Sequence, residues 1–207
     1  DASDHWLVLA TGAGLSGWNM AVDEVLLNHV GSLGHPVLRF YAWSEPAATF
    51  GYSQRYLEIA ALTSLRPLIR RPTGGGLVPH DDDWTYSVVV PPRHDWYALS
   101  AVDSYRRMHD WLRRSFAHCG LHTELAPCCD PAGPGQCFIG AEKHDLLLGR
   151  AKIAGAAQRR NRQGLLIQGS VQLPQATLPR GDWEAAMLLV GSGKPGVFSP
   201  WKLPPEL

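Results

Sequence analysis

The sequence predicts an α+β fold in which helices pack against a mixed, largely antiparallel sheet. Three observations support this class. Helical patterns alternate with pairs of strands rather than with single strands, one long amphipathic helix is visible near the middle of the chain, and three successive strands follow it as a meander. The chain has 207 residues, of which 45% are hydrophobic, and this is enough to bury one sizeable core. We therefore expect residues 1–207 to form a single domain.

The first half of the chain predicts a helix followed by short strands. "WNMAVDEVLLNHV" has helical spacing, so a helix should begin near Ser16. Its expected core face consists of Trp18, Ala21, Val22, Val25 and Leu26, with Asp23, Glu24 and Asn28 elsewhere. "PVLRFYAW" and "AATFGYSQ" are β-rich runs separated by a Ser-Glu-Pro turn, and "EIAALTSL" predicts a short helix.

The second half contains the clearest helix signal. "RPLIRRPTGGG" predicts a strand that enters a glycine loop, and "WTYSVVVPP" predicts a strand that leaves it. A helix should begin after Ser100, with Asp103 at the capping-box position, and end at Gly120. Residues 142–173 predict three strands with turns at Gly149 and at 161–164, and "DWEAAMLLVG" predicts a short helix near the end.

Composition limits the classes of partner. Nineteen basic residues balance nineteen acidic ones, so the net charge gives no reason to expect nucleic acid or an anionic membrane as a partner. Apolar runs are far shorter than the roughly 18 residues of a membrane helix, and the first residues lack a basic region. We therefore expect a cytoplasmic protein with no membrane partner.

The four cysteines do not match a metal site. Cys119 ends the long helix, Cys128 and Cys129 are adjacent, and Cys137 stands in "GPGQCFIG". Adjacent cysteines cannot reproduce the C-x-x-C spacing of zinc sites, so no metal is expected. Reduced thiols remain, and one of them could serve as a nucleophile.

The glycine loop is the first candidate site. Gly74, Gly75 and Gly76 expose bare backbone, which lets a flat or anionic ligand approach the peptide N–H groups. The loop matches neither the Walker pattern nor GxGxxG, so it does not require a nucleotide, and a tight connection between strands is the alternative. Arg70 and Arg71 precede it on a strand, where alternation should turn one of them away from the site.

The second candidate site is "KIAGAAQRR", residues 152–160. Lys152 follows a glycine turn on a strand, and Gly155, Ala156 and Ala157 leave room for a ligand to pass close to the backbone. A solvated lysine on an edge strand is the alternative.

Together, "RRPTGGGLVPHD", "KIAGAAQRR" and the "WNMAVDEVLL" helix resemble the catalytic domain shared by lipoate–protein ligases, octanoyltransferases and biotin ligases. The resemblance covers roughly residues 16–175. It implies the biotin/lipoate protein ligase type of fold, and the GRGR-type loop of the biotin branch is missing. Two chemistries follow from it. A lipoate–protein ligase activates lipoate with ATP and Mg²⁺, whereas an octanoyltransferase carries the acyl group on its own cysteine and needs no cofactor.

Cys137 favours the octanoyltransferase, because it lies where transferases of the ligase-like lineage carry their nucleophile. The chain ends about 30 residues after its last predicted sheet strand, which leaves no room for the C-terminal accessory domain typical of ligases. Two residues weigh against this assignment. Asp145 matches the acidic position that ligases use near Mg²⁺ and ATP, and Gln168 stands where the family usually has histidine.

The resemblance then implies a mechanism and partners. Cys137 would take an octanoyl group from acyl carrier protein, and a lysine of a lipoyl-accepting protein, such as glycine cleavage H protein, would receive it. Lys152 would stabilise the thiolate and orient the carbonyl, since a nearby opposite charge lowers the pKa of a thiol. Backbone N–H groups near Gly155 and Ala156 would face the oxyanion.

The glycine loop would then form one wall of a slot for the acyl chain. Arg71 and His80 would lie near the mouth of this slot, and Asp145 would also belong to the substrate site. Each buried methylene would contribute about 0.8 kcal/mol of affinity. A non-catalytic protein that binds acyl or lipoyl groups is the alternative of a different class.

Overall fold

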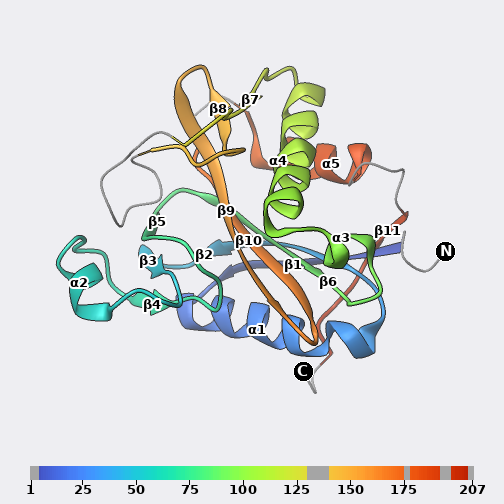
Figure 1. Ribbon diagram of the computed structural model, residues 1–207, viewed down its shortest axis with the longest axis horizontal. Helices are drawn as coiled ribbons and strands as arrows, with labels where there is room; N and C mark the ends of the chain where they lie inside the picture. The colour runs from blue at the N-terminus through green and yellow to red at the C-terminus, as the bar shows by residue number, and fades with distance from the viewer. Residues whose placement is uncertain (1–4, 130–139, 175–177, 192–196, 205–207) are drawn as a thin grey trace.

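The computed structural model describes residues 5–129, 140–174, 178–191 and 197–204. An eight-stranded sheet forms its centre, in the order β11-β1-β2-β6-β10-β9-β8-β7 (Figure 1). Its strands are β1 (His5–Gly14), β2 (Val37–Trp43), β6 (Trp84–Val90), β7 (Glu124–Leu125), β8 (Leu146–Leu148), β9 (Ala151–Asn161), β10 (Gly164–Val171) and β11 (Val197–Pro200). β1 pairs in parallel with β2 and β11, and the pairs from β2 across to β7 are antiparallel. The predicted α+β class with a mixed, largely antiparallel sheet is confirmed.

A second, smaller sheet lies beside the first and carries the glycine loop. It has the order β4-β3-β5, formed by β3 (Ala47–Phe50), β4 (Leu68–Arg70) and β5 (Val78–His80). The two strands predicted on either side of the Ser-Glu-Pro turn are both present, but the turn leads β3 away from β2 into this sheet. The glycine loop connects β4 to β5 within this sheet. The prediction that "WTYSVVVPP" is the strand leaving the loop is therefore wrong, because β5 comes between the loop and β6.

Helices cover both faces of the large sheet (Figure 1). On one face lies α1 (Ser16–Leu33), whose buried leucines and valines pack against Val37, Val89 and Leu166. On the other lie α3 (Asp95–Ala98), α4 (Ala101–His118) and α5 (Arg180–Val190), over a core rich in tryptophan. The alternation of β6 divides its valines accordingly: Val88 and Val90 face α4, and Val89 faces α1.

Most predicted elements have the expected type and place. α4 begins after Ser100, whose hydroxyl accepts from the Asp103 N–H at 3.0 Å, and Gly120 follows its end with φ of +79°. The helix predicted from "EIAALTSL" is shorter than expected and begins earlier, as α2 (Tyr56–Ala60). Its expected second half is a turn, because the Thr63 hydroxyl accepts from the Leu65 N–H at 3.1 Å and so competes with helical hydrogen bonds.

The predicted face of α1 is wrong in part. Trp18 is 46% exposed and Ala21 is also exposed, whereas Asp23, which we expected away from the core, is fully buried. The side of α1 that faces the sheet therefore includes a charged residue. Its burial is explained by the residues that surround it.

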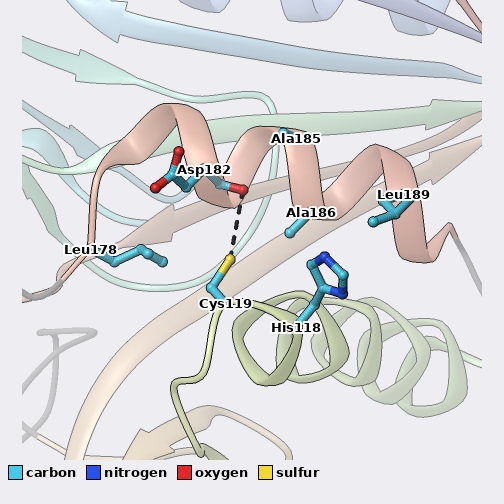
Figure 2. A pocket seen from close by; sticks show the side chains of 7 residues that line it. All are labelled: His118, Cys119, Leu178, Asp182, Ala185, Ala186 and Leu189. Carbon is cyan, nitrogen blue, oxygen red and sulfur yellow. Dashed lines mark hydrogen bonds between the residues drawn. The ribbon is translucent and has the colours of Figure 1, made fainter.

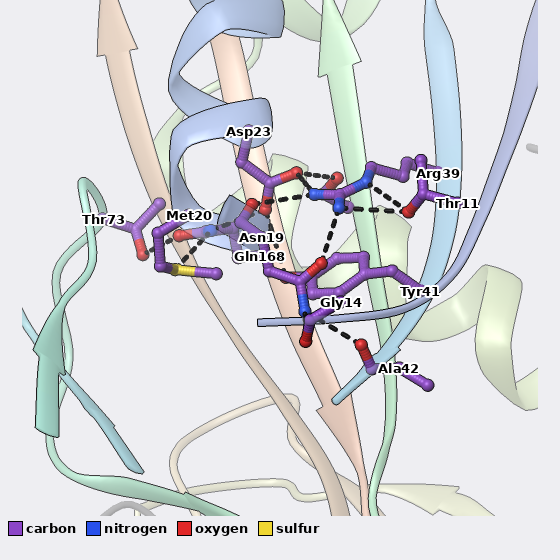
Figure 3. A network of polar contacts seen from close by, with 11 residues as sticks. Thr11, Gly14, Asn19, Met20, Asp23, Arg39, Tyr41, Ala42, Thr73 and Gln168 are labelled. Atoms are coloured by element: carbon purple, nitrogen blue, oxygen red, sulfur yellow. Dashed lines mark hydrogen bonds and ion pairs between the residues drawn. The ribbon is translucent and has the colours of Figure 1, made fainter. Parts of the chain in front are cut away.

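Asp23 lies in a buried polar network with Arg39 (Figure 3). The two side chains form an ion pair at 2.7 Å, and both are 0% exposed. Asp23 also accepts from the hydroxyls of Ser87 at 2.7 Å and Tyr41 at 3.1 Å. Burial, followed by the charge of Asp23, raises the pKa of Tyr41 well above its usual value, so the phenol stays a donor. The network joins α1 to β2 and β6.

Within the described part of the chain, no helix is both long and apolar enough to cross a membrane.

The Arg39→Met substitution should lower the free energy of unfolding by about 3 to 5 kcal/mol, because it leaves the Asp23 carboxylate buried without its counter-ion. Urea denaturation measures the change. The double variant Asp23→Asn/Arg39→Met should lose clearly less than the sum of the two single losses. As a control, Arg55→Met removes the exposed Arg55–Glu58 pair and should cost less than about 1 kcal/mol. Additive losses at Asp23 and Arg39 would contradict the pairing.

Candidate functional site

Lys152 lies at the start of β9, paired with the carboxylate of Asp145. Its Nζ is 2.7 Å from Asp145 Oδ2, and the two side chains are 7% and 0% exposed. The backbone N–H of Glu142 donates to the same oxygen at 2.6 Å. The Lys152 ammonium is thus buried and held by Asp145. The alternative of a solvated lysine on an edge strand is wrong.

Tyr105 of α4 completes the surroundings of Asp145. Its hydroxyl donates to Asp145 Oδ1 and accepts from the backbone N–H of Ala156 at 3.2 Å. Burial, and next the charge of Asp145, raises the pKa of Tyr105 well above its usual value, so the phenol stays protonated. An acyl oxygen could use the Ala156 N–H only by displacing this hydroxyl.

Gly155 provides the space that the lysine occupies. A Cβ at this position would lie 2.9 Å from Lys152 Cε, 3.1 Å from its Nζ and 3.3 Å from Asp145 Oδ1. These separations are shorter than ordinary van der Waals contact, so any side chain would push the ammonium aside. Four of the predicted residues therefore lie together: Lys152, Asp145, Gly155 and Ala156. We call these four residues and Tyr105 the lysine cluster.

His109 lies one helical turn after Tyr105, with the two ring centroids 4.2 Å apart. It is 0% exposed, and among the described residues neither ring nitrogen has a partner in hydrogen-bond geometry. Burial lowers its pKa from 6.5 to about 4. The ring is therefore neutral at physiological pH and adds no positive charge beside Lys152.

The glycine loop is shaped by Arg71. Its guanidinium donates to the carbonyl oxygen of Gly74 at 2.6 and 3.0 Å and to that of Gly76 at 2.7 Å. Gly75 has φ of +82°, a conformation that favours glycine. Arg71 is 5% exposed, whereas Arg70 is exposed, as the expected alternation requires. The contacts of Arg71 assign it to organising the loop, and its predicted contact with substrate stays a prediction.

His80 is a buried partner of the same region rather than an exposed residue. Its Nδ1 lies 2.9 Å from Asp83 Oδ2, and its Nε2 lies 2.8 Å from the hydroxyl of Thr49, which accepts from Arg71 at 3.3 Å. Its ring stacks on Trp43 with a centroid separation of 3.9 Å. Asp83, His80, Thr49 and Arg71 therefore form a continuous polar chain that ends at the glycine loop.

Two hydrogen bonds join the glycine loop to β9 and β10. The Thr73 hydroxyl donates to Gln168 Oε1 at 2.7 Å, and Arg159 Nη1 donates to the Pro72 carbonyl at 3.3 Å. Gln168 pairs with Ala157 across the sheet, and Ser170 pairs with Gly155. The two motifs singled out in the sequence therefore meet at β9 and β10.

Cys137 lies outside the described residues. Three other cysteines are described, all with free thiols: Cys128 and Cys129 are exposed, and Cys119 lines a surface pocket of about 470 Å³ between α4 and α5 (Figure 2). Burial, followed by the charge of Asp182, raises the pKa of Cys119, which disfavours the thiolate. None of the predicted site residues lines this pocket, so it is separate from the lysine cluster.

Asp145 does not have the surroundings of a magnesium ligand. Its carboxylate is fully buried, and its two oxygens accept from Tyr105, Lys152 and the Glu142 N–H. Magnesium sites usually keep several waters on the ion, whereas both oxygens of this carboxylate already accept from protein donors. Among the described residues, no group of three or more potential ligands could hold a metal ion. The geometry instead assigns Asp145 to holding Lys152.

Comparison with known proteins identifies the family. The family model of the lipoyl protein ligase A/B catalytic domain matches residues 16–174. The chain belongs to this family.

Curated relatives and solved structures refine the comparison. The chain is 33% identical over 183 residues to octanoyltransferase LipM of Exiguobacterium sibiricum, covering 82% of this chain and 66% of that protein. It is 35% identical over 182 residues to octanoyltransferase LipM of Symbiobacterium thermophilum, covering 82% and 65%. The bi-partite lipoate protein ligase of Thermoplasma acidophilum superposes with a TM-score of 0.70 at 19% identity, covering 98% of this chain and 88% of that one. The matched region spans slightly less than two thirds of the LipM proteins' length.

Sequence reasoning missed three side chains of this family member's site. Tyr105 was part of a predicted helix but had no assigned role, Thr73 was treated as part of the loop, and the role of Gln168 was left open. The spacing of Tyr105 and His109 by four residues, which puts both rings on one side of α4, was the one available signal. No local pattern shows that a helix places a phenol against a carboxylate 40 residues later.

The His109→Phe variant should keep more of its stability in acid than the wild-type protein. The unfolded chain binds a proton at this histidine below pH about 6.5, whereas the folded chain binds it only below about 4. The wild-type free energy of unfolding should therefore fall by about 3 kcal/mol from this group as the pH falls through that window.

Urea titrations at neutral pH and near pH 4.5 measure this difference. Phenylalanine keeps the ring contact with Tyr105 and removes the proton site. His118, which is exposed, provides the control, and His118→Gln should follow the wild-type pH dependence. Equal acid sensitivity of His109→Phe and wild type would contradict the assignment.

Proposed function

We propose that this protein is an octanoyltransferase that acts through a thioester on Cys137. The octanoyl group would come from acyl carrier protein, and its acceptor would be a lysine of a lipoyl-accepting protein, such as glycine cleavage H protein. The observation that carries the proposal is the buried Lys152–Asp145 pair beside Gly155, which fixes an ammonium at the surface of β9. The similarity to octanoyltransferases LipM supports the same reaction.

The reaction consists of two acyl transfers. In the first, the Cys137 thiolate attacks the carbonyl carbon of the donor thioester, the bond from that carbon to the carrier sulfur breaks, and the carrier leaves as a thiol after taking a proton. In the second, the neutral amine of the acceptor lysine attacks the Cys137 thioester. An amide forms, the carbon–sulfur bond to Cys137 breaks, and the amine proton is lost, so the enzyme returns to its starting state.

Lys152 assists both transfers through its positive charge. A thiol with a pKa of about 8.5 is only a few per cent ionised at neutral pH. A nearby cation that favours the thiolate therefore raises the fraction of the cysteine that can act as a nucleophile. The same charge stabilises the tetrahedral oxyanion, and a preorganised donor of this kind contributes about 3 kcal/mol in measured cases. Asp145 and Tyr105 hold the ammonium in position, so it need not be ordered during the reaction.

The partners follow from this chemistry. The T. acidophilum ligase is described together with its E2 lipoyl domain, which supports an acceptor of that class for a protein of the same fold. The identity of the acyl carrier protein donor, the absence of a cofactor, a cytoplasmic location and a single domain without accessory part stay predictions.

Intact-mass spectrometry after mixing with octanoyl-acyl carrier protein tests the proposal. We expect an octanoyl adduct on the wild-type protein and no adduct on Cys137→Ala. Lys152→Ala should form the adduct about a hundredfold more slowly or worse. Transfer to an added lipoyl-domain protein should then consume the adduct.

A parallel reaction with ATP, Mg²⁺ and octanoate separates the alternatives. Acceptor modification that requires ATP and is indifferent to Cys137→Ala would identify a lipoate–protein ligase. Binding of the acyl group with no modification in either reaction would identify a non-catalytic acyl-binding protein. Either result would overturn the proposed transferase.

The Gly155→Ala substitution should slow acyl transfer, because it moves Lys152 from its place beside Asp145. The new methyl group meets the flexible end of the lysine rather than backbone, so the side chain can shift away from Asp145. We expect a large loss of acylation rate together with some loss of stability, because the displaced ammonium leaves the fully buried Asp145 carboxylate without its counter-ion. Activity is therefore compared under conditions where circular dichroism shows both proteins folded. Gly181→Ala, at a helical position with nothing within 4 Å of the added carbon, is the control. A fully active Gly155→Ala would show that the position of the ammonium does not matter.

A further inference from the structure

Gln168 lies between the glycine loop and the buried ion pair. It is on β10 and is 6% exposed. Its Oε1 accepts from the Thr73 hydroxyl at 2.7 Å, and its Nε2 donates to Asp23 Oδ2 at 2.7 Å. Figure 3 shows the amide between these two side chains. The three residues form a continuous Thr73–Gln168–Asp23 chain.

The chemistry of Asp23 fixes the direction of this chain. An ionised carboxylate only accepts hydrogen bonds, so the amide must present its NH₂ to Asp23 and its oxygen to Thr73. The hydroxyl of Thr73 must in turn donate. Asp23 is itself immobilised by Arg39 and by the hydroxyl of Ser87, so the orientation of Gln168 is set by the core of the protein.

The other contacts of the loop come mostly from the small sheet and its neighbours. Arg71, directly after β4, binds the carbonyls of the loop, and the Tyr52 N–H donates to the Thr73 carbonyl at 2.8 Å. Gly51 allows a close approach, because a Cβ on it would lie 2.0 Å from the Gly75 oxygen. The Thr73–Gln168 hydrogen bond differs from these contacts because it is a buried side-chain bond to the large sheet, which also carries Lys152.

We infer that Gln168 is a positioning residue that sets the place of the glycine loop relative to the lysine strand. Thr73 immediately precedes Gly74, so a hydrogen bond at its hydroxyl limits how far the bare backbone can move from β9 and β10. This inference deepens the proposed function, on which its consequence for acyl transfer rests. The wall formed by residues 74–76 would hold the acyl chain, so its place beside β9 and β10 would set how tightly that chain binds.

Hydrogen exchange of the ligand-free protein tests the positioning without any substrate. Gln168→Leu and Thr73→Val each remove the bond with little change in volume, and each should speed exchange of the amides at residues 74–77 by about tenfold. The double variant should exchange no faster than either single variant, because all three lack the same bond. Gln158→Leu is the matched control: it removes a glutamine on β9 that bonds Ser104 and the Ala101 carbonyl, and it should leave the loop unchanged.

The conservative variant separates hydrogen bonding from packing. A neutral imidazole combines one donor and one acceptor, so Gln168→His should restore slow exchange, whereas Gln168→Glu offers no donor to Asp23 and should not. In the transfer assay, Gln168→Leu should raise KM for octanoyl-acyl carrier protein by about tenfold with a smaller change in kcat, since contacts with the chain are lost in the ground state and transition state alike.

The outcomes are distinguishable from failure of the proposed function. Faster loop exchange in Gln168→Leu and Thr73→Val supports the inference even in a protein that transfers no octanoyl group. Unchanged loop exchange in either variant, or a double variant whose effect is the product of the two single effects, overturns it. Should Gln168→Leu fail to fold, Thr73→Val still decides, because it keeps the hydrogen bond between Gln168 and Asp23.

Discussion

The buried ion pair between Asp23 and Arg39 is the interaction on which the arrangement of the site depends. Two charges with no exposed surface are stable only if their remaining hydrogen-bond capacity is satisfied, and here the surrounding donors and acceptors come from several elements. Arg39 also donates to the side chain and carbonyl of Asn19 on α1. A helix, two neighbouring strands and, through Gln168, the glycine loop are thereby fixed relative to one another. Apolar packing alone would tolerate small sliding movements that this directional network excludes.

The buried carboxylate of Asp145 has a different partner. Asp23 meets a guanidinium that is permanently charged and enclosed by the fold, so this pair is structural. Asp145 meets an ammonium at a position where Gly155, lacking a side chain, leaves the space that the ammonium occupies. The Asp23–Arg39 pair can fix the distances between the elements that it joins, and the Asp145–Lys152 pair can place a positive charge beside a ligand. Because Gln168 and Ser170 pair across the sheet with Ala157 and Gly155, both functions lie within a few residues on β9 and β10.

Local chemistry in the sequence was sufficient to predict the elements that carry their own signals. The cap at Ser100, the glycine turn at Gly149 and the glycine loop are all determined by neighbouring residues, and each is found where it was expected. β1 and β11 were missed, since neither has a turn or cap that sets it apart and their parallel pairing joins opposite ends of the chain. Asp23 was placed on the wrong face for the same reason. A carboxylate can be buried only where a partner distant in sequence meets it, and helical periodicity contains no information about Arg39.

The same limit explains why Lys152 could be singled out and Tyr105 could not. A lysine followed by small residues is visible in nine letters of sequence, whereas the role of Tyr105 exists only when α4 lies against β8 and β9. The start of α4 is tied to β9 by the hydrogen bonds of Gln158 with Ser104 and with the Ala101 carbonyl. Tyr105 follows Ser104 directly, so these bonds fix the height of the phenol above the sheet. Capping and the hydrogen bonds to β9 leave the backbone little freedom at the beginning of α4. The exact position of the side chains in the lysine cluster therefore depends on the start of this helix more than on the strand that carries Lys152.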